Sequence, residues 1–293
     1  MSSSIVKSAS FKNPEEMIRW AKDLASRPKI FSKLMECLDD PDSTFEDMAA
    51  IVKSDPALVI RLLKTVNSPF YNLREKIESV DHAIQVLGLQ ELTSLILATT
   101  VISHFKVVPE DIVTLESFWS HSIATAVATV VIAEHLEHKQ KTTLYTGAII
   151  HDIGSLIIYS LAPEAGSLAL ERCNEWGESL IEAEKNTLGF THQDVALALA
   201  KSWNLPEIHQ SILGFHHVPF TAEAFTRETM IVHLADYMAQ SLQLGSSGEH
   251  LPGQLDPQIL ETLGLDFDHL DLFCPRIIDG YTEAFDLLYR NNG

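Results

Sequence analysis

The sequence has few cysteines and few basic residues for its length. Its three cysteines, Cys37, Cys173 and Cys274, are far apart and odd in number, which argues against a disulfide framework and favours a reducing cytoplasm. It has 21 lysines and arginines against 40 aspartates and glutamates, and this formal charge of −19 disfavours non-specific binding to nucleic acid or to an anionic membrane surface. The N-terminus lacks the apolar core of a signal peptide, and runs such as SLILATTVI are too short to span a bilayer. We therefore predict a cytoplasmic protein without a nucleic-acid or membrane partner.

Strand patterns are also missing. No stretch shows the sustained alternation of a β-strand, and nearly every segment has the apolar spacing of a helix. The predicted fold class is therefore all-α, a multi-helix bundle. The polar stretch 106–117, KVVPEDIVTLES, separates a first bundle that ends near Phe105 from a second helical set. The helices of the second set are predicted at 118–137, 142–161, 165–186, 191–203, 206–217 and 226–243.

The chain is long enough, and at 46% hydrophobic apolar enough, for one large domain or two modest ones. The turn NSPFY, 67–71, is interpreted as an ordinary helix stop that could border a cleft. The stretch 245–257 is typical of a flexible loop, and the tail after it predicts two short helices that pack back on the bundle. We predict an N-terminal helix, a first helical half, a second helical half and a C-terminal tail, at 1–27, 28–108, 109–244 and 245–293.

A His-Asp doublet, His151 and Asp152, interrupts the apolar run GAIIHDIGSLIIYS at 147–160. A buried carboxylate must be neutralised by a metal ion, a hydrogen-bonding neighbour or water in a cleft. The doublet is predicted in the middle of a helix, and Gly154 after it lets another helix or a ligand approach the backbone closely. A purely structural His-Asp hydrogen bond is the alternative to a functional role.

Other imidazoles and an aspartate fall on different predicted helices, as in metal sites built inside helical bundles. They are His121, His192, His209, His216, His217, His233 and Asp236. Thr191 is predicted to cap a helix with Asp194, which places His192 in its first turn. His209 and His216 share a helix face, while His217 points roughly 100° away. Imidazole with carboxylate suits zinc, iron, nickel or manganese. The remaining histidines are interpreted as ordinary core or surface residues: His82, His104, His135, His138, His250 and His269.

The ordered motifs resemble the HD superfamily of metal-dependent phosphohydrolases. HDIG at 151–154 follows FWSHS on an earlier helix and precedes HLAD on a later one. The resemblance implies His121, His151, Asp152 and Asp236 as metal ligands. It is closer to the HDOD branch of bacterial signalling proteins, through the stretch 54–92 and GFTHQDVALALAKSWNLPEIHQSILGFHH at 189–217. That branch implies an N-terminal helical HDOD subdomain and a role as an output module.

The sequence is also similar to the HD-GYP branch, which cleaves cyclic dinucleotides at sites of two or three metals. That similarity implies His192, His216 and His217 as further ligands. The chain departs from this branch because Ser155 stands in place of the lysine of HDIGK, and VPFTAEAF replaces a Gly-Tyr-Pro loop. Both changes argue against phosphodiester hydrolysis, which depends on positioning and on stabilisation of charge.

Three interpretations follow. The first is a regulatory HDOD module with little or no catalysis, one or two divalent transition metals, and partner proteins or a nucleotide or other phosphate ligand. The second is a metal-dependent phosphohydrolase. The third is a structural metal without an open coordination position.

Overall fold

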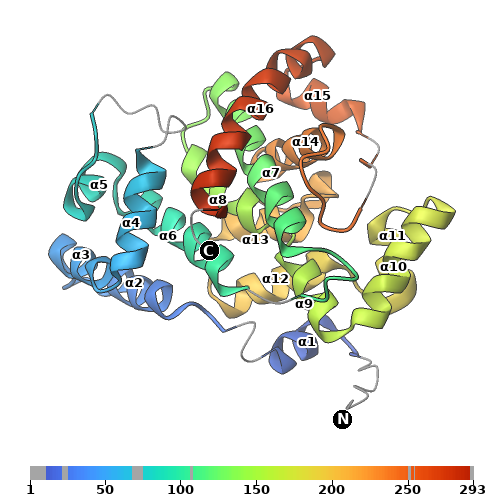
Figure 1. Ribbon diagram of the computed structural model, residues 1–293, viewed down its shortest axis with the longest axis horizontal. Helices are drawn as coiled ribbons and strands as arrows, with labels where there is room; N and C mark the ends of the chain where they lie inside the picture. Colours follow the sequence, from blue (N-terminus) through green and yellow to red (C-terminus); the bar gives the residue numbers. More distant parts are fainter. Residues whose placement is uncertain are drawn as a thin grey trace.

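The computed structural model describes residues 11–21, 26–67, 75–105, 108–249, 252–253 and 255–290. Within these ranges every regular element is helical and no strand occurs, so the predicted all-α bundle is confirmed (Figure 1). The turn at 67–71 lies outside the described residues except for Asn67. The division of the chain into four segments stays a prediction.

The first half contains six helices among the described residues. They are α1 (Pro14–Trp20), α2 (Lys29–Asp39), α3 (Phe45–Lys53), α4 (Pro56–Val66), α5 (Val80–Leu87) and α6 (Leu89–His104). Their starts follow local chemistry: the side chain of Asn13 accepts a hydrogen bond from Glu16 N at the start of α1, and Thr44 forms a capping box with Asp47 at the start of α3. In Figure 1, α2 to α5 lie together on the left of the molecule.

The second half and the tail contain ten α-helices in the described part. They are α7 (Leu115–His135), α8 (Lys141–Ile150), α9 (Ile153–Leu161), α10 (Pro163–Trp176), α11 (Leu180–Leu188), α12 (His192–Ser202), α13 (Glu207–Phe215), α14 (Thr226–Ser241), α15 (Pro257–Leu263) and α16 (Phe267–Leu288). A single 3-10 turn, η2 (Pro219–Thr221), precedes α14.

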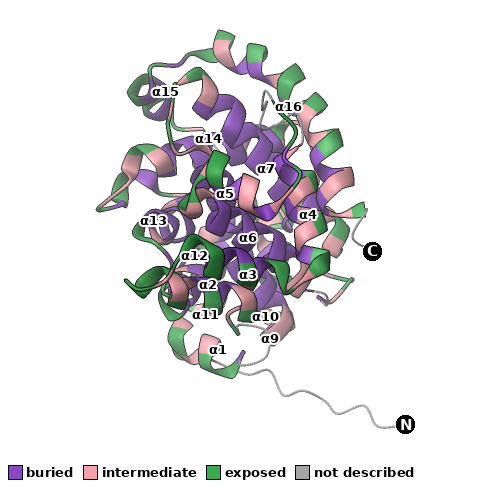
Figure 2. Cartoon of the chain, turned by 90° about the vertical axis from the view of Figure 1, so that its left-hand side faces the viewer, coloured by how far each residue is buried: buried purple, intermediate pink, exposed green. Residues whose placement is uncertain are grey.

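Helix α7 is the centre of the bundle, because α8, α14 and α16 all pack against it. Nearly all of its side chains are buried, as the colouring of Figure 2 shows. Small residues such as Ala124, Ala126 and Ala128 let three helices approach its backbone closely. The buried hydroxyl of Thr129 donates to the carbonyl oxygen of Thr125 within the helix, so this donor is paired.

Three local predictions differ from the structure. The stretch 142–161 is two helices, because the chain turns at His151 and Asp152 between α8 and α9. The stretch 165–186 is also two helices, separated by Gly177 in the left-handed conformation and by the capping box of Ser179 with Glu182. The second helix of the tail, α16, is 22 residues long and not short, even though it contains Pro275.

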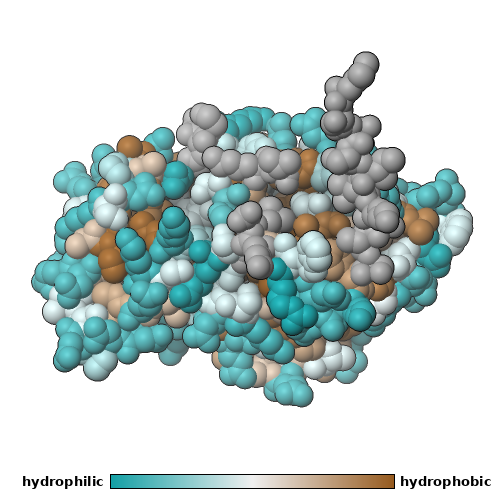
Figure 3. All heavy atoms as spheres, turned by 90° about the horizontal axis from the view of Figure 1, so that it is seen from below, coloured by the Kyte–Doolittle hydropathy of each residue, from teal (hydrophilic) through white to brown (hydrophobic). Residues whose placement is uncertain are grey.

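Two stretches, Leu115–His135 and Lys141–Leu161, have the length and apolar composition of a membrane span, and α5 with α6 would form a third if counted as one bent span. These runs are longer than the sequence analysis expected. Burial explains their apolar character. In the most apolar 18-residue segment of each of the first two stretches, 83% and 89% of the segment is buried inside the protein. Figure 3 shows one face of the molecule, where hydrophilic surface surrounds scattered hydrophobic patches.

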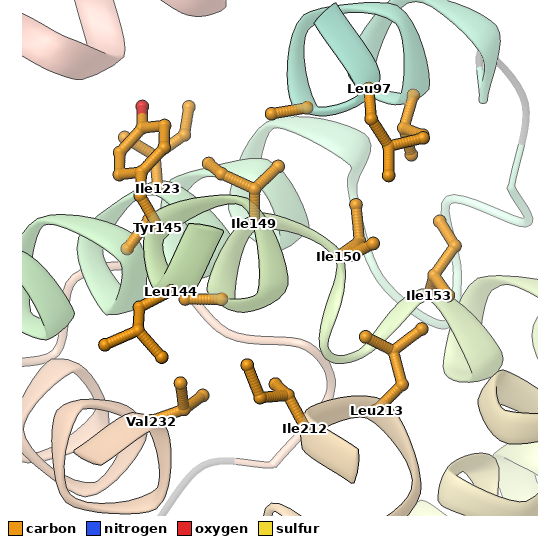
Figure 4. Close-up of a cluster of buried hydrophobic side chains, with 14 of the residues drawn as sticks. Leu97, Ile123, Leu144, Tyr145, Ile149, Ile150, Ile153, Ile212, Leu213 and Val232 are labelled. Carbon is orange, nitrogen blue, oxygen red and sulfur yellow. The ribbon is translucent and has the colours of Figure 1, made fainter. Parts of the chain in front are cut away.

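Apolar side chains surround the turn that carries the doublet. Ile149, Ile150 and Ile153 lie on both flanks of this turn, and their side chains point toward the same side in Figure 4. They belong to the same buried core as Leu97 of α6 and Leu213 of α13. Apolar side chains of the core therefore surround the backbone of the doublet, and the polar side chains of His151 and Asp152 contact each other.

Candidate metal centre

Seven predicted side chains converge at one place in the bundle. Their positions are His121 on α7, His151 and Asp152 between α8 and α9, His192 at the start of α12, His216 and His217 directly after α13, and Asp236 on α14. The start of α12 follows the prediction, because Thr191 and Asp194 form a capping box there. Six of the seven side chains are buried, and His217 is partly exposed.

The carboxylate of Asp152 lies at the centre of this cluster. Its Oδ2 atom is 3.2 Å from His151 Nε2 and 3.5 Å from His121 Nε2. Its Oδ1 atom is 3.3 Å from His216 Nε2 and 3.5 Å from His192 Nε2. Each oxygen thus faces a different pair of imidazoles, which is the geometry of a carboxylate that bridges two sites.

The other two members complete the two sides of Asp152. On one side, Asp236 Oδ1 lies 3.0 Å from His121 Nε2 and 3.7 Å from His151 Nε2. On the other side, the His217 ring lies 4.3 Å from that of His216, measured between ring centroids. Two groups that can hold a metal ion therefore share Asp152, one with His121 and His151 and the other with His192, His216 and His217.

Hydrogen bonds of the outward nitrogens of three imidazoles show that each ring carries a proton on Nδ1. Nδ1 of His151 lies 2.7 Å from Ala148 O, and Nδ1 of His216 lies 3.1 Å from Ile212 O. Nδ1 of His192 lies 2.8 Å from the carboxylate of Glu184. Because a carbonyl or carboxylate oxygen only accepts, each Nδ1 donates its proton, and in the neutral ring Nε2 carries a lone pair toward the cluster. This arrangement is typical of histidines that bind metals through Nε2.

Two of the nitrogens that face inward lack hydrogen-bond partners. Nε2 of His121 and Nε2 of His151 are buried without a partner of acceptable geometry, although carboxylate oxygens lie nearby. Nε2 of His192 and Nε2 of His216 lie 3.4 Å apart. Two neutral imidazoles would oppose their lone pairs there, so a proton or a cation is needed between them. A protonated His192 can supply that proton, and the imidazoles and carboxylates of the cluster also have the donor atoms that a transition metal binds.

The charges of the cluster depend strongly on one another. Burial disfavours a charged imidazole, but the carboxylates of Asp152 and Asp236 outweigh it and raise the pKa of His121 to about 9. For His192 burial is likewise outweighed, here mainly by Glu184, and its pKa rises to about 9. Burial lowers the pKa of His216 to about 4. Burial raises the pKa of a carboxyl, but the imidazoles hold the pKa of Asp152 well below its usual range. The carboxylate is therefore ionised and buried, as a metal ligand must be.

Glycines let the helices that carry the ligands approach each other. A Cβ on Gly154 would lie 2.0 Å from the backbone oxygen of His192, so only glycine lets α9 and the start of α12 meet there. This confirms the close approach that the sequence predicted for Gly154. A Cβ on Gly245 would lie 2.5 Å from His121 N, and its φ of +84° also favours glycine. Both positions hold a backbone that bears a proposed ligand.

A cavity of about 230 Å³ leads from the surface to this cluster. His217 and Asp236 of the cluster line it, together with Tyr237 and Gln240 of α14. Glu249 lines it as well, and burial raises the pKa of this carboxyl to about 7. No lysine or arginine is among the described residues that line the cavity.

The sequence of most of this chain matches a known family. The sequence pattern of the HDOD domain fits residues 24–219. The chain belongs to the HDOD family.

Solved HDOD-like structures share the fold. An HDOD domain protein of unknown function from Geobacter sulfurreducens is 23% identical, with a TM-score of 0.71 over 94% of this chain and 98% of its own. A proposed phosphohydrolase from Shewanella amazonensis is 21% identical, with a TM-score of 0.70 over 94% and 99%. A proposed signal transduction protein from Marinobacter aquaeolei is 18% identical, with a TM-score of 0.65 over 92% of this chain and 61% of its own.

One curated relative also matches the HDOD chain. It is an uncharacterized protein from Treponema pallidum, 25% identical over 242 residues. The match covers 78% of this chain and 45% of the relative, so the chain spans less than half the length of that protein.

Two histidines left open by the sequence lie outside the two groups. His233 donates from Nδ1 to the carbonyl oxygen of His216 at 2.6 Å, so it holds the backbone next to the proposed ligands. His209 is buried elsewhere on α13 and contacts Thr143 O. It does not join His216, because seven residues of helical backbone separate the two by roughly 10 Å along the axis of α13.

Sequence reasoning missed two carboxylates at the HDOD centre. Glu184 lies on the buried face of α11 between Leu180 and Leu188, and a glutamate at that spacing among leucines was the available signal. Glu249 comes from the Gly- and Ser-rich stretch after α14, where no periodicity could have indicated it. Metal binding by the seven predicted residues stays a prediction.

Proposed function

We propose that this chain is a regulatory HDOD module that retains a divalent metal centre, has little or no phosphohydrolase activity, and acts through partner proteins or a bound ligand. Metal-dependent phosphohydrolysis is the alternative, and it is favoured by one observation: no proposed ligand position is missing from the cluster.

The donor set supports one or two ions. His121, His151 and Asp236 would hold one ion, and His192, His216 and His217 the other, with Asp152 between them. Iron, manganese, zinc and nickel all accept imidazole with carboxylate. Bound metals of this kind supply a bridging water of lowered pKa and polarise a phosphoryl oxygen.

The charge of the access cavity argues against phosphoester turnover, and this is the observation that carries the proposal. A phosphodiester is an anion, and enzymes that cleave it surround it with cationic groups. Here the described lining contains the carboxylates of Asp236 and Glu249 and the imidazoles of His217 and His233, but no lysine or arginine. Ser155 is fully buried and neutral, so it supplies no cation where the HD-GYP lysine would be. Apart from these imidazoles, charge stabilisation would come from bound metal.

A regulatory role agrees with the kind of protein that shares this fold. The Marinobacter protein is named for signal transduction, and the HDOD match covers both the N-terminal helices and most of the metal-binding half of this chain. The second half keeps the proposed metal-binding side chains, but its acidic cavity disfavours anions. Such a half is suited to change its contacts with a partner protein when a metal or a small molecule binds.

The first experiment compares metal content and turnover in the same preparations. Wild type, Asp152→Ala and the exposed control Asp111→Ala are expressed with iron and manganese supplied, then assayed against bis(p-nitrophenyl) phosphate and cyclic di-GMP. We expect stoichiometric metal in wild type and in Asp111→Ala, none in Asp152→Ala, and no turnover above the metal-free background in any of them. Turnover that disappears in Asp152→Ala alone would establish the phosphohydrolase instead. A wild type without metal would leave the doublet as a hydrogen-bonded structural pair.

A second variant tests the charge argument directly. Glu249→Gln removes the partly buried carboxylate from the cavity without changing its size. At pH 8.5, where the carboxyl of Glu249 is ionised, inorganic phosphate should therefore bind about fivefold more tightly to the metal-loaded variant, which corresponds to removing about 1 kcal/mol of repulsion. Isothermal titration measures this difference. Equal phosphate affinity would show that the acidic lining does not exclude anions.

A further inference from the structure

A second cavity lies away from the metal centre, between the two halves of the chain. Its volume is about 290 Å³, at the small end of pockets that bind small molecules. Helices α2 and α6 of the first half form most of its wall, and the start of α13 forms the rest. Its residues are Phe31, Met35, Leu38, Gln90, Thr93, Ser94, Leu97, Pro206 and His209.

The lining is mainly apolar, with polar groups from two helices: Gln90, Thr93 and Ser94 of α6 and His209 of α13. Phe31 and Leu97 are fully buried, whereas Leu38 is 36% exposed beside the opening. The hydroxyls of Thr93 and Ser94 belong to buried residues on successive positions of α6. No aspartate, glutamate, lysine or arginine is among the described residues that line this cavity. A charged molecule would lose its hydration here without a counter-ion, so an occupant must be neutral.

His209 is the polar group of this cavity whose bonding is incomplete. Its side chain is 1% exposed, and Nε2 lies 3.2 Å from Thr143 O. Since a carbonyl only accepts, Nε2 carries the proton and Nδ1 is a bare acceptor. Nδ1 is buried and has no hydrogen-bond partner among the described residues. Burial also lowers the pKa of His209 to about 4, so the ring stays neutral near pH 7. An unpaired buried acceptor is costly, and a bound donor would satisfy it.

We propose that this cavity is a binding site for a small, neutral, mainly apolar molecule that carries one N–H or O–H donor, with that donor on Nδ1 of His209. The apolar body of the ligand lies against Phe31 and Leu97, and the hydroxyls of Thr93 and Ser94 flank its polar end. The site is separate from the metal centre, and it does not depend on the function proposed above.

The location links such a ligand to both halves of the protein. It contacts α2 and α6 on one side and α13 on the other. His209 and Thr143 lie on α13 and α8, and these same helices end at His216 and at the His151–Asp152 turn. A bound molecule that shifts His209 would therefore displace α13, and α8 through Thr143. Both helices carry proposed metal-binding residues at their opposite ends.

The test uses two probes of the same shape. Indole has an N–H donor, and benzofuran has an oxygen in its place. Protein labelled with ¹⁵N at histidine is titrated with each probe, and the Nδ1 resonance of His209 is followed. We expect saturable binding of indole with a shift of that resonance, and binding of benzofuran about tenfold weaker, because the buried acceptor then stays unpaired.

His209→Phe is the matching variant. It should lose the preference for indole over benzofuran, because the acceptor for the N–H of indole has been removed while the cavity stays apolar. If this variant does not fold, the comparison of the two probes on wild type still decides the question. Equal affinity of wild type for both probes, an unchanged His209 resonance, or no saturable binding of indole would each overturn the proposal.

Discussion

Glu184 holds His192 through two hydrogen bonds to one carboxylate oxygen. Oε2 lies 2.8 Å from the backbone nitrogen of His192 and 2.8 Å from its Nδ1 atom. Both partners are buried, and they come from neighbouring helices, α11 and α12. This pair turns Nε2 of His192 toward Nε2 of His216, at 3.4 Å. A residue outside the predicted ligand set therefore fixes the direction in which a proposed ligand, His192, points.

Replacing Glu184 by glutamine should weaken metal binding without removing a ligand. Glutamine keeps one oxygen acceptor but loses the charge that makes His192 more basic, so we expect a loss of about 10- to 100-fold in metal affinity. Competition with a chromogenic chelator measures that affinity. Glu171→Gln, an exposed change on α10, is the control. Unchanged affinity in Glu184→Gln would show that His192 does not bind the metal.

Replacing Gly154 by alanine should disturb the centre through the backbone. The added Cβ would lie 2.0 Å from His192 O, so α9 and α12 must separate. Overpacking of this kind costs about 1–3 kcal/mol, and the shift of His192 should also lower metal content. Thermal unfolding and elemental analysis measure the two effects. Gly253→Ala is the control, because no atom lies within 4 Å of its added Cβ. Normal metal content in Gly154→Ala would mean that His192 tolerates displacement.

Removing the metal should lower the melting temperature. Asp152 and Asp236 are buried beside imidazoles whose lone pairs face inward, and a bound cation stabilises the folded state that assembles them. We expect a chelator to lower Tm in wild type and to have no effect on Asp152→Ala, which has already lost its metal. Differential scanning calorimetry makes this comparison. A wild type that releases its metal without any change in Tm would argue against a stabilising role.

His209 should make the protein sensitive to mild acid. The folded protein has a pKa of about 4 at this imidazole, because of burial, against about 6.5 in the unfolded chain. Between these values the unfolded chain binds the proton and the folded protein does not, so stability is lost as the pH falls. From pH 7 to pH 5 the loss should be about 2 kcal/mol for this group.

His209→Gln should remove that part of the acid sensitivity. Glutamine can still donate a hydrogen bond toward Thr143 O, and the metal cluster titrates alike in both proteins, so the difference between them isolates His209. Urea unfolding at pH 7 and pH 5 measures it, with His82→Gln as the control at a partly exposed position. An identical loss of stability in wild type and His209→Gln would contradict burial of a neutral imidazole.

The sequence by itself was enough to predict the fold class and the seven side chains that converge in the His/Asp cluster. Helical spacing and the absence of strand alternation predicted the bundle, because these patterns are local. Capping chemistry placed the starts of helices, including the Thr191 cap that precedes His192. A carboxylate in an apolar run indicated Asp152, since an unpaired buried charge is too costly to keep without a role.

Only the tertiary structure decided how these residues meet. The break between α8 and α9 is invisible in an apolar run that continues through it, yet it turns the two oxygens of Asp152 toward different pairs of imidazoles. Glu249 reaches the access cavity from an irregular segment with no periodic pattern. His209 and His216 share a helix face but not a site, because two helical turns place them roughly 10 Å apart, beside different neighbouring helices. Contacts between residues far apart in the chain depend on how whole helices pack, and no local pattern encodes that packing.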